Sequence, residues 1–419
     1  MNPLGPYEPL RTERKEIRLL KLCSTESDIM TAHMKVATLG DEGLSYDALS
    51  YAWGSDDLLQ AIEINGHHVW VSTNLYDFLR VQTRKKTRLS LLWIDQLCIN
   101  QSDLDEKAAQ IALMDQIYAR ARKTLVWLGP DADQGAAFAS IHKVARLSHD
   151  LDRLIFSKNL AVAERLAVLR LICLPYWSRH WIIQELCISR ELKLCYGEKQ
   201  IPWNLFAQQT FWGANSTVWT TEEDECEATE HFSRVMRLRH LMGSPSSSST
   251  RVNNAFWYRV MVATARSKCK DPRDKVYGLQ SVLADNCRID VDYSKSVVDV
   301  YFAHIEALFH VDHGRSDLFA RACLELAIGM DIAPTTDHRG RLEQWKRDHP
   351  RHANNEELVK AKLRLDLEHL QKFLIDTRRQ ALVEESNDRV DAWPAFQNAL
   401  IEKVLYVGLV NASAHHVPR

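Results

Sequence analysis

Three short apolar runs, separated by stretches with helical spacing, constrain the fold of this chain more than any other feature. They are residues 89–94 (LSLLWI), 123–128 (KTLVWL) and 191–196 (ELKLCY). Nearly continuous apolar runs of this length are typical of strands that are buried on both faces of a parallel sheet. Between the first two runs, apolar residues recur every three or four positions from Ala108 to Ala121, which predicts a helix. The alternation predicts an α/β fold with a doubly wound, mainly parallel sheet.

Shorter signals before the first run add strands and a hairpin. Residues 17–23 (IRLLKLC) and 46–53 (YDALSYAW) have strand character, and the second stretch stops at Gly54, a turn signal. The pair Asn65-Gly66 lies between two runs rich in β-formers, AIEI and HHVWV. This pair predicts a two-residue hairpin, because both residue types adopt positive φ readily.

Helices are expected on both sides of the run 89–94. Residues 73–81 place three apolar side chains on one side of a helix. The sequence SDLDE at 102–106 fits a capping box in two registers, so it predicts the start of the helix that ends near Ala121. A further helix is expected over 177–190.

The bulk composition excludes several classes of protein. A formal net charge of −2 gives no global attraction toward nucleic acid, and no apolar run approaches the ~20 residues that span a bilayer. The nine cysteines include no C-x-x-C pair, so neither a disulfide framework nor a zinc site is expected. Prolines and charges stand near the N-terminus, where a signal peptide has its apolar core. We therefore expect a cytoplasmic protein with no bound metal, no nucleic-acid partner and no membrane span.

The pattern divides the chain into four segments, of which the second carries the strand–helix alternation. The segments are 1–40, a leader with the first strand; 41–200, the α/β domain with a helical insertion at 131–175; 201–310, a helical segment with the motif DPRDKVYGL at 271–279; and 311–419, a charged helical C-terminal extension. Within the motif, Arg273, Asp274 and Lys275 are expected to form an ion-paired brace.

Three blocks of sequence carry a family resemblance. They are YDALSYAWG at 46–54, LWIDQLCINQ at 92–101 and WSRHWIIQEL at 177–186. With the motif at 271–279, they make the chain resemble the fungal heterokaryon incompatibility (HET) family over roughly residues 40–300. The resemblance implies a role in non-self recognition and regulated cell death. One departure is that residues 310–419 are charged and helical in pattern, where many members continue into a glycine-rich β region.

A second, more distant resemblance is to TIR domains. YDALSY followed by GSDD is similar to the opening strand and loop of a TIR domain, and Trp181-x-x-x-Glu185-Leu186 looks like its W-x-x-x-E-L helix. The resemblance implies a TIR-like (flavodoxin-like) core with helical insertions. In TIR enzymes the matching glutamate serves cleavage of NAD at its nicotinamide–ribose bond, so the candidate catalytic residue is Glu185 and NAD is a candidate substrate rather than a bound cofactor.

The residues themselves are compatible with such a site. Trp181 and Glu185 are four positions apart and share one helix face, where burial would favour the neutral form of the carboxyl group. A carboxylate can stabilise the oxocarbenium-like state of glycosidic cleavage. Ligands of open α/β sheets lie beyond the carboxyl ends of the strands. The expected pocket residues, besides Glu185, are Tyr51, Trp53, Gly54, Asp95, Asn100, Gln101 and Trp181.

Each of these residues has a structural alternative. Glu185 in the first turns of a helix favours the helix dipole and can pair with an arginine, and Trp181 can be core. Asp95 can cap the next turn through its side chain, while Asn100 and Gln101 can simply shape their loop. Cys98 is expected to be a buried thiol rather than a nucleophile.

Two functions of different class follow from this. One is an enzyme that hydrolyses NAD (an NAD nucleosidase) with Glu185 as its carboxylate. The other is a non-enzymatic signalling module that associates with itself or with an incompatibility partner protein. The fold alone supports both uses. Whether Glu185 lines an open cleft or is buried against an arginine separates them.

Overall fold

The computed structural model describes most of the first 331 residues, which fall into two compact units. The units are residues 1–250 and 251–419, and each is described by itself. The described residues are 6–23, 29–54, 59–84, 90–147, 160–214, 227–242, 254–283, 287–312 and 317–331. Most of the predicted C-terminal extension, residues 332–419, lies outside them. Within the described ranges, no helix has the length and apolar character needed to cross a membrane.

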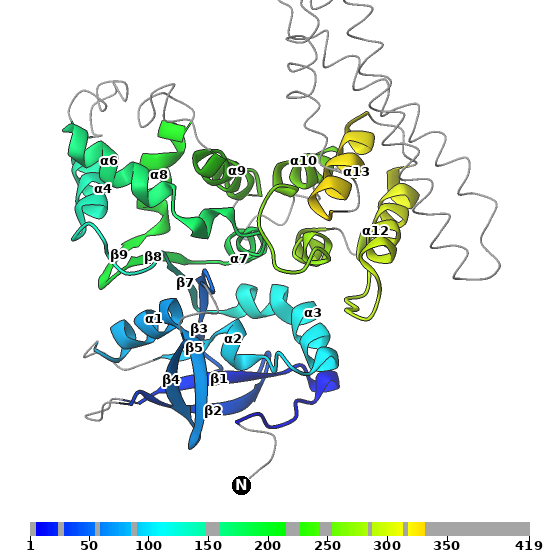
Figure 1. The fold of residues 1–419 in the computed structure, drawn as a ribbon, viewed down its shortest axis with the longest axis horizontal. Coiled ribbons are helices and arrows are strands. Elements are labelled where there is room, and N and C mark those ends of the chain that lie inside the picture. Colours follow the sequence, from blue (N-terminus) through cyan, green and yellow to red (C-terminus); the bar gives the residue numbers. More distant parts are fainter. Residues whose placement is uncertain are drawn as a thin grey trace, which may run out of the picture. The chain divides into compact units, whose positions relative to one another are not determined.

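Unit 1 contains a mixed sheet of nine strands in the order β5-β4-β2-β1-β6-β3-β7-β8-β9 (Figure 1). The strands are β1 (Glu16–Leu22), β2 (Thr31–Thr38), β3 (Tyr46–Tyr51), β4 (Leu59–Ile64), β5 (His67–Ser72), β6 (Leu91–Trp93), β7 (Lys123–Trp127), β8 (Leu192–Tyr196) and β9 (Lys199–Pro202). The four strands β6-β3-β7-β8 are parallel to one another. They include the three apolar runs predicted to be buried parallel strands, so the α/β class is confirmed.

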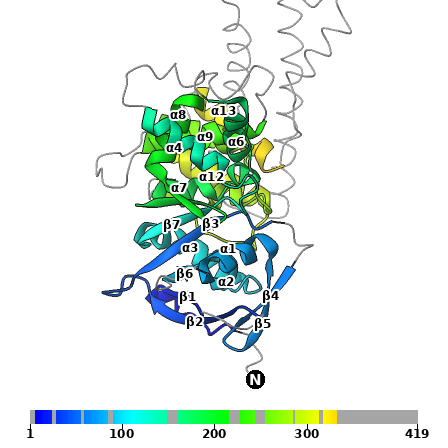
Figure 2. The same ribbon diagram turned by 90° about the vertical axis from the view of Figure 1, so that its left-hand side faces the viewer.

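The prediction of a mainly parallel sheet is wrong. Antiparallel pairing joins β1 to β2, β1 to β6, β4 to β5 and β8 to β9, whereas β2 and β4 are parallel. The physical reason is that hairpins need only a short turn, so they can be added at both edges of a parallel core. Figure 2 shows two of them side by side, the β1–β2 pair and the β4–β5 pair. The second pair is the hairpin predicted from Asn65-Gly66, and both residues have positive φ.

The central strand β3 is buried along its whole length because helices cover both of its faces. On one side Tyr51 packs in a cluster with Phe78 of α1 (Thr73–Thr83). On the other side the Tyr46 hydroxyl donates to the Ile117 carbonyl oxygen of α3 (Leu104–Arg120), at 2.6 Å. Figure 1 shows α1 and α3 on opposite sides of β3.

The remaining helices of unit 1 follow β6, β7 and β9. They are α2 (Asp95–Cys98), α4 (Ala136–Leu147), α6 (Val162–Ile172), α7 (Ile182–Ile188), α8 (Trp203–Ala214) and α9 (Glu227–Met242), with 3-10 turns η1 (Thr12–Arg14) and η3 (Pro175–Ser178). Helices α4 and α6 lie within the predicted insertion 131–175, of which residues 148–159 lie outside the described ranges. The helix expected over 177–190 is shorter than predicted, because the extended backbone of Arg179 separates η3 from α7.

Unit 2 is helical in its described part. Its helices are α10 (Asn254–Thr264), α11 (Asp274–Tyr277), α12 (Val297–Asp312) and α13 (Asp317–Gly329), with a 3-10 turn η4 (Gln280–Val282). Of the predicted ion-paired brace, only Arg273 forms an ion pair among the described residues, and its partner is Asp271 at 2.7 Å rather than Asp274, which accepts from the Tyr293 hydroxyl. Lys275 is buried and donates to the Ala265 carbonyl oxygen instead, at 2.8 Å.

Candidate functional site

Glu185 lies in the first turn of α7 and is almost completely buried, with 1% of its surface exposed. One carboxylate oxygen, Oε2, accepts a hydrogen bond from the Ser50 hydroxyl of β3. The Ser50 oxygen is also 2.6 Å from the Tyr176 hydroxyl of η3. The β3 strand thus supplies a polar side chain on the sheet face that α7 covers, next to the carboxylate.

An arginine completes the immediate surroundings of Glu185. The Arg179 Nη1 atom lies 3.7 Å from Glu185 Oε2, and the Arg179 side chain is 16% exposed. This Nη1 atom is buried and makes no hydrogen bond with any described residue. Arg179 is also close enough to Asp95 for its charge to act on that carboxylate.

Burial raises the pKa of Glu185 to about 7. This value is the net result, since the Arg179 guanidinium and the hydrogen bond from Ser50 lower the pKa and the negative charge of Asp95 raises it. A carboxyl group with a pKa near neutrality can hold or release a proton at working pH, which suits acid–base chemistry.

Asp95 stands at the point where β6 ends and α2 begins. Its Oδ2 atom accepts from the indole nitrogen of Trp53 at 2.9 Å, and its Oδ1 atom accepts from the Gln96 backbone N–H at 2.7 Å. The Gln101 side chain donates to the Asp95 carbonyl oxygen at 3.0 Å. Burial raises the pKa of Asp95, and Arg179 opposes this shift. The Asp95 carboxylate therefore binds both the backbone of its own turn and Trp53.

The other expected pocket residues have contacts or backbone conformations of their own. The Tyr51 hydroxyl donates to the Gln96 side chain at 2.9 Å, which ties β3 to α2. Gly54 has a φ of +84°, a left-handed conformation that favours glycine. Asn100 accepts from the Ser102 hydroxyl at 2.7 Å and so shapes its own loop. Trp181 precedes α7, half-buried, and its carbonyl oxygen accepts from the Glu185 backbone N–H at 3.2 Å.

The structure thus brings together Trp53, Asp95 and Glu185, and adds residues that the sequence reading did not select. These are Ser50, Tyr176 and Arg179. A signal for two of them was present in the sequence. Ser50 is a polar residue inside a strand that is otherwise apolar on the same face, and Arg179 is a charge between two tryptophans in WSRHW.

The described residues include no cluster of side chains suited to bind a metal ion. In the part of the chain that the structure describes, no group of three or more His, Cys, Asp or Glu side chains could hold a metal ion. Cys98 is buried and burial raises its pKa to about 12, so its thiol is held in the unreactive form.

The charge of Arg179 gives a first testable prediction. Replacing Arg179 with glutamine is expected to raise the pKa of Glu185 above about 7, because the cation that lowers it is lost. Carbon-13 NMR titration of the Glu185 carboxyl group measures this. The matched control is Arg239→Gln, which removes an arginine that donates to the Cys187 and Ser189 carbonyl oxygens beside the same helix. An unchanged titration in Arg179→Gln would contradict the assigned interaction.

Comparison with known proteins gives two matches and one negative result. The sequence model of the family "Heterokaryon incompatibility protein (HET)" matches residues 46–185. The chain is also 38% identical over 101 residues to "Heterokaryon incompatibility protein 6, OR allele" of Neurospora crassa. That alignment covers 21% of this chain and 15% of the relative, so it spans a small part of the relative's length. No solved structure matches the chain.

Proposed function

We propose that the protein acts in heterokaryon incompatibility, in non-self recognition that leads to regulated cell death, because the HET family model matches residues 46–185. The similarity to an incompatibility protein of Neurospora crassa over 101 residues supports this role. We propose further that it acts with an incompatibility partner protein or with a second copy of itself, in the cytoplasm.

We place the activity at the cluster around Glu185, in a core of TIR-like (flavodoxin-like) type. Along the chain, β6, β3, β7 and β8 are the second, first, third and fourth parallel strands, which is the order of a flavodoxin-like sheet. Trp53 and Asp95 follow the carboxyl ends of β3 and β6, where ligands of such sheets bind. This placement supports a dinucleotide site formed by the loops after those two strands.

The reaction proposed for the cluster is cleavage of NAD at the nicotinamide–ribose bond. The bond between the ribose C1′ atom and the pyridinium nitrogen breaks, its electron pair neutralises the pyridinium, and nicotinamide leaves. The Glu185 carboxylate stabilises the oxocarbenium-like state, and a water molecule then attacks C1′ and releases a proton. The observation that carries the proposal is the convergence of Asp95, Arg179 and a carboxyl group with a pKa of about 7.

The described conformation keeps Glu185 covered, so the proposed reaction needs a movement of Arg179. The guanidinium is held by the 3.7 Å ion pair with Glu185, and its segment joins η3 to α7 with an extended backbone. A substrate that offers oxygen acceptors to the guanidinium would compete with this contact, since arginine binds such groups through two parallel hydrogen bonds. Movement of the side chain would then expose the carboxylate.

The test is to incubate the purified, concentrated protein with NAD and to follow nicotinamide release. Glu185→Ala is expected to reduce release by about a hundredfold or more, as loss of a stabilising carboxylate does. The control is Glu198→Gln, which changes a carboxylate that is 72% exposed. Absence of release by the wild-type protein in every assembly state would refute the enzymatic proposal. Release that survives Glu185→Ala would refute the role of Glu185 alone.

The sequence-based criterion favours the second function, because Glu185 is buried against Arg179 rather than exposed in an open cleft. With 1% exposure, an arginine partner and a hydrogen bond from Ser50, the carboxylate also fits a structural role inside a non-enzymatic signalling module. Such a module would work by self-association. In that case light scattering would show concentration-dependent assembly without NAD turnover, and Glu185→Ala would change stability rather than any catalytic rate.

A further inference from the structure

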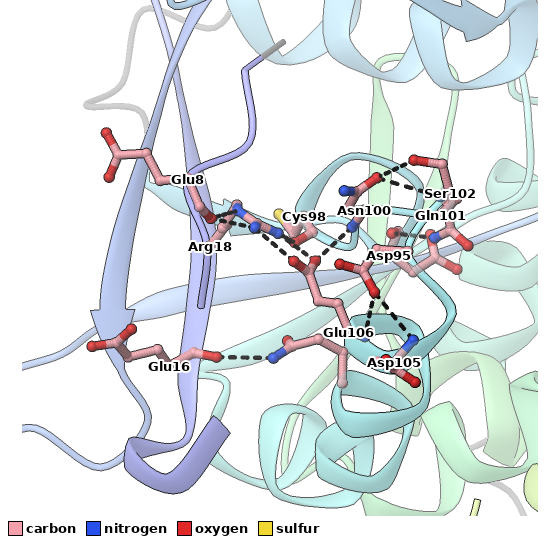
Figure 3. A network of polar contacts seen from close by, with 12 residues as sticks. Glu8, Glu16, Arg18, Asp95, Cys98, Asn100, Gln101, Ser102, Asp105 and Glu106 are labelled. Atoms are coloured by element: carbon pink, nitrogen blue, oxygen red, sulfur yellow. Dashed lines mark hydrogen bonds and ion pairs between the residues drawn. The ribbon is translucent and has the colours of Figure 1, made fainter. Parts of the chain in front are cut away.

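A buried arginine of β1 forms the most extensive polar network near the candidate site (Figure 3). The Arg18 side chain is 1% exposed, and its Nη1 and Nη2 atoms form two parallel hydrogen bonds with the carboxylate of Glu106 at 2.6 and 2.8 Å. Nη1 also donates to the Cys98 carbonyl oxygen at 3.2 Å. Nε donates to the Glu8 carbonyl oxygen at 3.2 Å, and the Tyr7 ring covers the guanidinium with its centroid 5.0 Å away.

Glu106 also binds the loop that follows α2. Its Oε1 atom accepts from the Asn100 backbone N–H at 2.7 Å, in addition to Arg18. The prediction of the helix cap, at Asp103, is therefore confirmed. The prediction of the reciprocal bond from the Glu106 side chain is wrong. Asp103 accepts from the Glu106 backbone N–H, while the Glu106 carboxylate turns to Arg18 and Asn100.

The loop in turn reaches Asp95. Gln101, the neighbour of Asn100, donates through its side chain to the Asp95 carbonyl oxygen at 3.0 Å. The Asp95 carboxylate accepts from Trp53 at 2.9 Å. Figure 3 shows the steps from Glu8 to Asp95 in one view. Two sets of hydrogen bonds, linked by the peptide bond between Asn100 and Gln101, thus join the N-terminal segment at Glu8 to the backbone of Asp95.

We infer that Arg18 is a positioning residue of the candidate site, which holds the 99–103 loop in place through Glu106 and, through that loop, holds Asp95. The inference rests on the location of the proposed site and is independent of the reaction proposed there. Without Arg18, the Glu106 carboxylate loses its partner in a site where its side chain is only 11% exposed. It must then turn toward water to be solvated, because an unpaired buried charge is strongly unfavourable, and so it leaves the Asn100 N–H.

The effect should be visible at Glu185, which Arg18 does not contact. Asp95 is one of the groups that raise the pKa of Glu185, so a displaced Asp95 lets that pKa fall. The other charged, titratable or hydrogen-bonding groups that face Glu185 come from elements outside the 99–103 loop. They are Arg179, Ser50, Tyr51, Tyr118 and Tyr176.

The experiment compares Arg18→Met with Arg122→Met in the full chain. Arg122 is the control, because it also forms a two-bond pair, with Asp47 of β3 at 2.9 and 2.8 Å, that does not include the 99–103 loop, while its side chain is 50% exposed. Amide hydrogen exchange and carbon-13 titration of Glu185 are measured without any substrate. In Arg18→Met the Asn100 amide is expected to exchange about tenfold faster, and the Glu185 pKa is expected to fall. Both quantities should stay unchanged in Arg122→Met.

A second variant keeps the inference testable if Arg18→Met does not fold. Glu106→Gln retains the size of the side chain and weakens its bonds to Arg18 and Asn100, so it should shift both measurements in the same direction. Unchanged Asn100 exchange and an unchanged Glu185 titration in the folded variant would overturn the positioning role. Because neither measurement uses NAD, a failure of NAD cleavage leaves the inference standing, and turnover of NAD does not rescue it.

Discussion

Between pH 4.5 and pH 7 the wild-type protein is expected to lose about 3 kcal/mol of its free energy of unfolding, because Glu185 is buried. Replacing Glu185 with glutamine is expected to abolish this loss. The ordinary pKa of the carboxyl group is 4.5, and burial raises it to about 7 in the folded protein. Below pH 4.5 both states hold the proton. As the pH rises toward 7, the unfolded state ionises while the folded state stays protonated, so the folded state loses relative stability.

Urea unfolding of both proteins at a series of pH values measures this effect. The free energy of unfolding of Glu185→Gln, minus that of the wild type, should rise across the window and level off above pH 7. Glu198→Gln is the control, since its side chain is 72% exposed and lies on the surface. Parallel stability curves for Glu185→Gln and the wild type would show that burial of this carboxylate does not shift its pKa.

Replacing Trp177 with alanine is expected to lower the free energy of unfolding by about 3–5 kcal/mol. The Trp177 side chain is 1% exposed and stacks on Phe206 of α8 with ring centroids 5.7 Å apart. Its ring also meets Phe232 of α9 edge-on at 4.9 Å, and its indole nitrogen donates to the Leu171 carbonyl oxygen at 2.9 Å. Truncation therefore leaves a cavity between three helical elements and an acceptor without its donor.

Urea unfolding and near-ultraviolet circular dichroism measure this loss. The matched control is Trp70→Ala, because the Trp70 side chain is 63% exposed on β5 and its removal creates no cavity. That variant should remain within about 0.5 kcal/mol of the wild type. Equal stability of the two variants would argue against the packing role of Trp177.

Trp177 also illustrates which parts of the fold could be predicted from the sequence. Local signals were sufficient for the hairpin at Asn65-Gly66 and for the apolar strands β6, β7 and β8. They failed at the helix expected over 177–190, in which Trp177 lies in η3 rather than in α7. The extended backbone at Arg179 interrupts the helix there, and no residue type between 177 and 181 indicates this interruption.

The sequence identified the strand-end loops and Glu185, but not the pairings that define their environment. Arg18 and Glu106 are 88 positions apart, and Ser50 and Glu185 are 135 apart. Contacts between residues so far apart in the sequence depend on which strands become neighbours. The periodicity of apolar residues within one segment does not indicate this. The same reason explains the error about the sheet, since nothing in β1 indicates that it pairs with β6.

The position of β1 has a practical meaning for dividing this protein into parts. The matched family segment, 46–185, begins after β1 and β2 and ends before β8. A fragment cut at those boundaries would leave β6 and β7 as open edges, with unpaired backbone groups that invite aggregation. It would also lack Arg18, so that Glu106 would have no counterion. The segment recognised by sequence comparison is thus smaller than the sheet to which it belongs.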